Sequence, residues 1–421
     1  MTIRCRSVGS RLSAVVAGSV LTAIAAAPAA AQQSDPIGRG LAAAAIAAAR
    51  TGATTAASET AAGTASAEPQ APADSPVLKF FSGTELTGFV DTYYSYNFNT
   101  PKTACATVGG VAIFNCLHNF DVAHNSFSLN LAELALEKKP TADSRGGFRI
   151  DLDYGATASL VAGFDPGGST YNNIQQAYVS YLAPAGKGSL QLDFGKFVTP
   201  AGFEVIETKD NWNYSRGLLF SLAIPYYHLG MRAAYSPSDK LTVTGFLFNG
   251  WNNSVENNGG KSVGVQFIGK PSGALGVTAN YIGGPELSAD NADWRHLFDV
   301  IVTRRVSPMV DVAVDYVIGT ELSKTWQGIA AYLKYQPNAW FALTPRYELF
   351  NDRDGWALIG QHVQEFTLTG ELKHKDGVTM RVEYRGDVTQ DPFFVKNASD
   401  VVKTQNALTI AWVYAFSSRM P

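Results

Sequence analysis

Charged side chains of both signs gather in one stretch of the chain, residues 196–221, which reads KFVTPAGFEVIETKDNWNYSRGLLFS. The alternation of apolar and polar residues that is typical of the surrounding segments stops here. The stretch contains no histidine that could activate a nucleophile, so its acids and bases favour electrostatic handling of a solute over bond-making chemistry. Its charged residues of interest are Glu204, Glu207, Lys209, Asp210 and Arg216.

Residues that could support catalysis are dispersed along the rest of the chain. A hydrolytic site needs a nucleophile or an activated water near a histidine and a carboxylate. The chain has neither GxSxG nor HExxH, and its six histidines lie in different predicted strands and loops: His118, His124, His228, His296, His362 and His374. We therefore expect no enzymatic activity, no cofactor and no metal site.

The first 79 residues differ from the rest of the chain. Residues 1–31 combine early arginines, the apolar run LSAVVAGSVLTAIAAA and a small-residue stretch, which indicates a cleaved secretory signal peptide. Residues 32–79 are rich in Ala, Pro and Ser and cannot build a core, so we interpret them as a periplasmic leader. The remaining 80–421 form the predicted folded domain.

Composition excludes several partners. The chain has 36 acidic and 33 basic residues and no basic block, so nucleic acid is not an expected partner. No apolar run of about 18 residues follows the signal peptide, which excludes a helical membrane span. Cys105 and Cys116 are eleven residues apart, and export to an oxidising compartment favours a disulfide between them over two free thiols.

From about residue 85 the apolar residues recur with a period of two, as in a strand with one apolar face. In VTMRVEYR, for example, Met380, Val382 and Tyr384 alternate with charged residues. Sixteen such segments follow one another, and the connections between them alternate between short turns and mostly longer loops. This plan predicts an all-β fold, a transmembrane antiparallel up-and-down β-barrel of about 16 strands.

A barrel of this size encloses water, whereas about eight strands leave an interior filled by side chains. We expect the charged faces to line the lumen, with these wall residues: Arg149, Asp151, Asp153, Arg232, Arg295, Arg381, Glu383 and Arg385. The stretch 196–221 joins the fifth and sixth strands, and we expect it to fold inward as a constriction that filters solutes by size and charge. A loop lying outside as a surface lid, and a soluble sandwich with one wet face, are the alternatives.

Several segments resemble the porin-2 family of outer-membrane β-barrel proteins of Gram-negative bacteria. They lie between about Gly88 and Asn253 and include NSFSLNLAELALEK, LDFGKFVTPAGFEVIETKDNWNYSRGLLF and KLTVTGFLFNGWNN. The resemblance implies a passive channel for small hydrophilic solutes and ions, embedded in outer-membrane lipid and lipopolysaccharide, and general porins suggest a homotrimer. It supplies no particular solute and no catalytic residue. A plugged structural or adhesive barrel with little channel activity is the alternative function.

Overall fold

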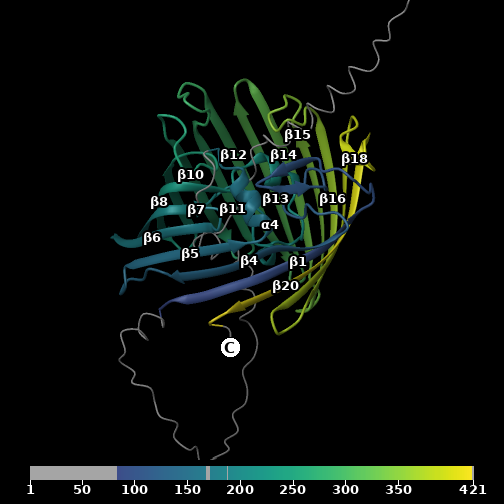
Figure 1. Ribbon diagram of the computed structural model, residues 1–421. Coiled ribbons are helices and arrows are strands. Elements are labelled where there is room, and N and C mark those ends of the chain that lie inside the picture. The colour runs from purple at the N-terminus through teal and green to yellow at the C-terminus, as the bar shows by residue number, and fades with distance from the viewer. Residues whose placement is uncertain (1–82, 167–170, 187, 420–421) are drawn as a thin grey trace, which may run out of the picture.

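The computed structural model describes residues 83–166, 171–186 and 188–419. The predicted signal peptide, 1–31, and the predicted leader, 32–79, lie outside these residues. Within the described residues, sixteen strands form one closed antiparallel barrel (Figure 1). The fold class and the strand number expected from the sequence are confirmed.

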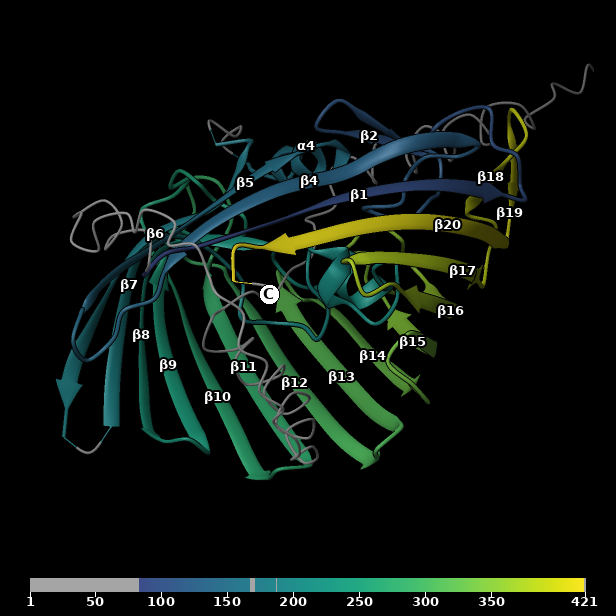
Figure 2. The ribbon, with the colours of Figure 1, turned by 90° about the horizontal axis from the view of Figure 1, so that it is seen from below.

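The barrel strands follow the chain in order. They are β1 (Glu85–Asn97), β4 (Ser126–Lys138), β5 (Gly146–Tyr154), β6 (Ile174–Ala185), β7 (Gly188–Val198), β8 (Tyr227–Ser238), β9 (Leu241–Phe248), β10 (Ser262–Ser272), β11 (Leu275–Pro285), β12 (Trp294–Ser307), β13 (Val310–Glu321), β14 (Lys324–Tyr335), β15 (Phe341–Asn351), β16 (His362–Lys373), β17 (Val378–Thr389) and β20 (Thr404–Ser417). Each pairs with its neighbours, and β1 closes the ring by pairing with β20, from Thr87 opposite Ser417 to Asn97 opposite Ala407 (Figure 2).

The long connections carry the remaining elements. Two small hairpins, β2 (Ala106–Val108) with β3 (Val111–Ile113) and β18 (Phe394–Lys396) with β19 (Asp400–Val402), lie in the loops before β4 and before β20. The helix α4 (Ala156–Gly163) follows β5, and the short helical turns η1 (Thr208–Asp210) and η2 (Leu219–Ala223) lie between β7 and β8. No helix among the described residues is long and apolar enough to span a membrane.

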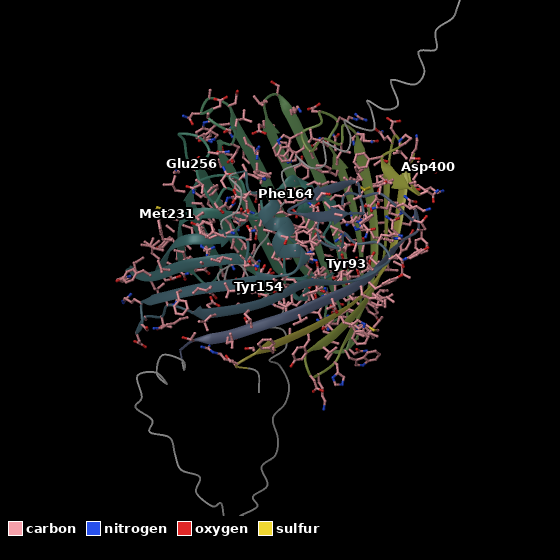
Figure 3. The ribbon with its side chains drawn as sticks, viewed as in Figure 1. Tyr93, Tyr154, Phe164, Met231, Glu256 and Asp400 are labelled. Atoms are coloured by element: carbon pink, nitrogen blue, oxygen red, sulfur yellow. A yellow bond between two sulfur atoms is a disulfide. The ribbon has the colours of Figure 1, made fainter. Side chains whose placement is uncertain are left out.

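Side chains alternate between the two faces of the barrel wall because successive residues of a strand point to opposite sides. On β17, Val382 and Tyr384 are each 41% exposed, whereas Arg381 and Arg385 are almost completely buried. Figure 3 shows the same division elsewhere, with Tyr154 and Met231 exposed on the outside and Tyr93 buried. The outer face is therefore apolar and the inner face is polar, as membrane-embedded barrels require.

Turns on one rim are short and most loops on the other rim are long. β12 and β13 are separated by two residues. β13 and β14 are also separated by two residues, Leu322 and Ser323. Both residues of this second turn have positive φ, 48° and 65°, as in a type I′ hairpin turn. It is an exception on the rim where long loops were expected. The remaining alternation of short and long connections follows the sequence prediction.

Candidate functional site

The loop between β7 and β8, residues 199–226, contacts strands far from its own attachment points. The backbone N–H of Gly202 donates to Asp299 of β12 at 3.0 Å, and that of Phe203 donates to Asp315 of β13 at 2.9 Å. The N–H of Tyr214 donates to Glu383 of β17 at 2.6 Å. These acceptors are buried carboxylates of the inner face. The β7–β8 loop thus lies against the inner wall opposite its anchoring strands.

An arginine of β15 joins this loop to the wall. Arg346 is fully buried, and its Nε lies 2.8 Å from Glu365 of β16. Its Nη1 lies 2.5 Å from Glu204 of the loop and 2.6 Å from the Ser215 carbonyl oxygen. Glu204 also accepts the N–H of Gly217 at 2.6 Å, which ties the two limbs of the loop together. A guanidinium with this many charge-assisted hydrogen bonds fixes the loop strongly.

The other predicted loop charges differ in their surroundings. Arg216 is buried and donates to the carbonyl oxygens of Val205, Ile206 and Tyr214, so it holds the loop's own backbone. Glu207 is also buried. Lys209 and Asp210 form an ion pair at 2.6 Å with side chains that are 22% and 37% exposed. Of the five predicted loop charges, this pair is therefore the one that water reaches best.

The predicted wall arginines lie on the inner face and pair with carboxylates of the wall. The pairs, with their nitrogen–oxygen distances, are Arg149–Asp151 (2.9 Å), Arg232–Asp193 (2.8 Å), Arg295–Glu321 (2.8 Å), Arg381–Glu371 (2.6 Å) and Arg385–Asp387 (2.9 Å). Asp153 is buried on the same face. Each of these wall arginines is thus neutralised by a neighbouring carboxylate.

Two of these arginines also donate hydrogen bonds to the backbone of the β7–β8 loop. Arg381 donates to the carbonyl oxygens of Thr208 and Asn211 at 2.6 and 2.7 Å. Arg385 donates to the carbonyl oxygen of Arg216 at 2.7 Å. The acid-to-base contact that the sequence hypothesis invoked forms between Glu204 and Arg346, a wall residue that the hypothesis did not name.

Aromatic side chains from several loops and from β14 pack beside the β7–β8 loop. Phe120, from the segment after β3, lies 5.4 Å from Phe220 and 5.6 Å from Tyr226 between ring centroids. Trp326 stacks on Trp356 at 3.5 Å and donates its Nε1–H to the Ala223 carbonyl oxygen at 2.9 Å. All five side chains are at most 6% exposed. These side chains therefore form a buried aromatic cluster against the β7–β8 loop.

A buried carboxyl group, Glu286, follows β11 directly. It accepts hydrogen bonds from the Trp251 backbone N–H at 2.7 Å and from the Ser262 hydroxyl at 2.6 Å. Burial raises the pKa of Glu286 to about 7, although the charge of Arg295 acts in the opposite direction. Glu286 therefore changes its charge near neutral pH, at the base of the loop that carries Trp251.

The segment before β4 is closed on itself by a disulfide and is bound to the barrel by hydrogen bonds. Cys105 and Cys116 form a disulfide across the β2–β3 hairpin, with a Cα–Cα distance of 5.7 Å. The backbone N–H of Cys116 donates to Gln405 of β20 at 2.9 Å. Within the described residues, no group of three or more His, Cys, Asp or Glu side chains is arranged to hold a metal ion.

Sequence reasoning missed several inner-face residues that bind the loop, namely Arg346, Asp299, Asp315 and Glu348. The alternation itself could have found them, because each lies in the inward phase of a strand whose outward residues are apolar. Arg346, for instance, lies between Pro345 and Tyr347 in the strand segment FALTPRYELF. The alternation does not specify the register between strands or the path of the loop, so the partners of these residues could not be predicted from it.

Comparison with known proteins supports the same class of fold. The family model described as putative beta-barrel porin-2, OmpL-like, matches residues 83–416. No curated protein matches the chain in sequence.

Solved porin structures share the architecture at low sequence identity. They include Salmonella typhi OmpF in complex with daunomycin (14% identity, 79% of this chain and 97% of that chain, TM-score 0.53). Two others are the anion-selective porin from Comamonas acidovorans (11%, 79% and 99%, 0.51) and the trimer form of Vibrio cholerae OmpT (11%, 79% and 99%, 0.50). At such identities the likeness shows the fold alone, whereas the family match covers most of the chain. The chain belongs to the putative beta-barrel porin-2, OmpL-like family and is a porin-like barrel of the outer membrane.

Proposed function

We propose that this protein is a passive diffusion channel for small hydrophilic solutes and ions, in which the β7–β8 loop sets selection by size and charge. The observation that carries the proposal is the contact of Glu204 in this loop with Arg346 of the wall, inside a sixteen-strand barrel. Sixteen strands enclose a lumen wide enough for water, and a loop across it narrows the path. The channel needs no cofactor and carries out no catalysis.

Charge selection arises from groups that water reaches beside the loop. Lys209 and Asp210 present opposite charges on the loop itself, and Lys373 of β16, 39% exposed, pairs with Glu371 at 3.0 Å. Charged groups beside a narrow aqueous path create a local field that orients dipolar solutes and distinguishes anions from cations. The remaining predicted wall charges contribute through the same field, weakened by their local pairing.

The test is single-channel recording from purified protein in planar bilayers. Replacing Glu204 and Glu207 together by Gln removes two negative charges from the loop, so we expect conductance and the ratio of cation to anion permeability to change. Glu256→Gln is the matched control, because Glu256 pairs with Lys261 in the β9–β10 loop. Values for the double variant that equal those of wild type and control would exclude Glu204 and Glu207 as determinants of selectivity.

A plugged structural or adhesive barrel is a second candidate, and the buried aromatic packing favours it. The aromatic side chains on one side of the loop are almost completely buried: Phe120, Phe220, Tyr226, Trp326 and Trp356. Stepwise conductance in a bilayer supports the channel, and persistent silence supports the plugged barrel. Liposome swelling with sugars and amino acids of graded size then identifies the solutes.

We also propose that the chain is exported by a signal peptide cleaved near Ala31 and that it assembles as a homotrimer in lipid and lipopolysaccharide. The trimer form of the similar Vibrio cholerae OmpT supports this assembly. Crosslinking of the purified protein, followed by gel electrophoresis without heating, tests the oligomeric state. A protein that migrates as a monomer after crosslinking contradicts it.

A further inference from the structure

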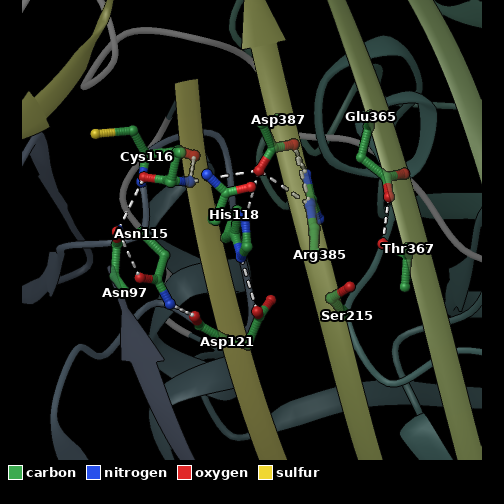
Figure 4. A network of polar contacts seen from close by, with 12 residues as sticks. Asn97, Asn115, Cys116, His118, Asp121, Ser215, Glu365, Thr367, Arg385 and Asp387 are labelled. Carbon is green, nitrogen blue, oxygen red and sulfur yellow. Dashed lines mark hydrogen bonds and ion pairs between the residues drawn. The ribbon is translucent and has the colours of Figure 1, made fainter. Parts of the chain in front are cut away.

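His118, in the segment 114–125 between β3 and β4, lies between two carboxylates (Figure 4). Its Nδ1 is 2.7 Å from Asp121 in the same segment, and its Nε2 is 3.0 Å from Asp387 on β17. All three side chains are almost completely buried. His118 is thus a buried bridge between a loop and the barrel wall.

Both contacts require the imidazole ring to donate. An ionised carboxylate only accepts hydrogen bonds, and a neutral imidazole carries one N–H. Burial and the nearby charge of Arg385 oppose protonation, but the two carboxylates outweigh them and raise the pKa of His118 above its ordinary value of 6.5. The bridge is therefore built around an imidazolium.

The charged groups around the bridge connect it to the β7–β8 loop. Arg385 pairs with Asp387 at 2.9 Å and donates to the Arg216 carbonyl oxygen of the loop at 2.7 Å. The guanidinium of Arg216 lies 4.5 Å from the Phe120 ring centroid, two residues after His118. From β20, the neutral side chain of Gln405 donates to the Cys116 carbonyl oxygen at 2.9 Å. The bridge, the disulfide segment and the loop thus form one connected contact network.

We propose that His118 is a proton-controlled latch that holds the segment 114–125 over the β7–β8 loop and keeps the channel closed. Deprotonation leaves one N–H for two buried carboxylates, so His118 loses either its bond to Asp121 or its bond to Asp387, which keeps Arg385, and the segment is released from the wall. The regulation rests on the proposed channel function and adds a pH-sensitive gate to it. The released segment carries Phe120 away from Phe220 and Tyr226, which uncovers the loop.

The direction of the pH effect follows from the raised pKa. A histidine with a folded pKa above its unfolded pKa stabilises the closed state fully below about pH 6.5. That contribution is lost as the pH rises through the folded pKa. The ratio of closed to open channels falls by about ten-fold for each unit by which the folded pKa exceeds that of the released segment. The channel therefore opens on alkalinisation.

The first experiment observes the latch without reference to conduction. Nitrogen NMR of histidine-labelled full-length protein in detergent, with His118→Gln for assignment, gives the protonation state of His118 at each pH. We expect two protonated ring nitrogens at pH 6 and a titration midpoint above 6.5. A neutral ring at pH 6 overturns the latch.

The second experiment measures open probability between pH 6 and pH 9 in planar bilayers. We expect it to rise with pH in wild type, to be high and flat in His118→Gln, and to rise at a lower pH in Asp121→Asn, which keeps one of the two carboxylates. His374→Gln is the control, because His374 is 62% exposed in the turn after β16 and should behave as wild type. A conducting wild type with a flat profile overturns the latch.

A wild type that is silent at every pH overturns the channel proposal, and the latch is then decided by stability. In that case samples are heated to increasing temperatures before electrophoresis, and the temperature at which the folded band is replaced by the unfolded band is measured. This temperature should fall from pH 6 to pH 9 in wild type and stay constant in His118→Gln. A fall of equal size in both proteins overturns the latch.

Discussion

Replacing Arg346 by methionine removes the guanidinium that joins the β7–β8 loop to the wall and keeps a side chain of similar length. The change leaves Glu204 and Glu365 buried without their arginine. Removing one partner of a buried ion pair costs about 3–5 kcal/mol, because the remaining charge stays uncompensated. Since about 1.4 kcal/mol corresponds to a factor of ten, the population in which the loop is detached should rise by about 150-fold to 5,000-fold.

Hydrogen exchange measured by mass spectrometry reports this population, because backbone N–H groups of residues 199–226 exchange when the loop detaches. We expect faster exchange there in Arg346→Met and unchanged exchange in the barrel strands. The matched control is Arg305→Met, which breaks a pair with Asp311 whose side chains are 19% and 20% exposed. A pair that water reaches contributes less than a fully buried pair. Equal loop exchange in the two variants would show that Arg346 does not hold the loop.

Three further predictions concern the loops and their anchors. Because the folded pKa of Glu286 is about 7 against 4.5 unfolded, its burial costs nothing below about pH 4.5 and up to about 3 kcal/mol above pH 7. Unfolding midpoints should therefore be higher for Glu286→Gln than for wild type at pH 8 and not at pH 4, and equal midpoints at pH 8 would contradict the buried charge. Reducing the Cys105–Cys116 disulfide should destabilise its segment by about 3 kcal/mol, seen as faster hydrogen exchange, and a double serine variant should match the reduced protein. Gly217→Ala should bring a Cβ against the Glu348 carboxylate and weaken the loop by about 1–3 kcal/mol, measured by the same exchange; unaltered exchange would show that the loop has room there.

The strands were predictable because the membrane and the lumen impose opposite solvents on the two faces of each strand. In VTMRVEYR the outward Val382 and Tyr384 and the inward Arg381 and Arg385 are separated by phase alone. The same reasoning located the β7–β8 loop, since alternation stops where the chain leaves the wall. It also paired Cys105 with Cys116, from their separation and the expected compartment.

The partners of the charged residues were not predictable in the same way. Arg346 meets Glu365 through the register of β15 and β16, and it meets Glu204 across 142 residues of sequence. Arg216 has the positive charge expected of a pore-lining residue, but its guanidinium donates hydrogen bonds to three backbone carbonyl groups of its own loop. Such contacts depend on the path of a loop without periodicity, and the sequence contains no local signal for it.

The pairing of β1 with β20 sets the order of events when this protein assembles. Thr87 and Ser417 are neighbours in the wall but are separated by 330 residues of chain. Contacts of such sequence separation form slowly, because a large loop must close before they form. Until the final strand has been delivered, β1 and β17 both expose open edges that can pair with other chains. β20 is thus required before the wall is sealed, and a chain that stops short of it should be a target for aggregation and proteolysis.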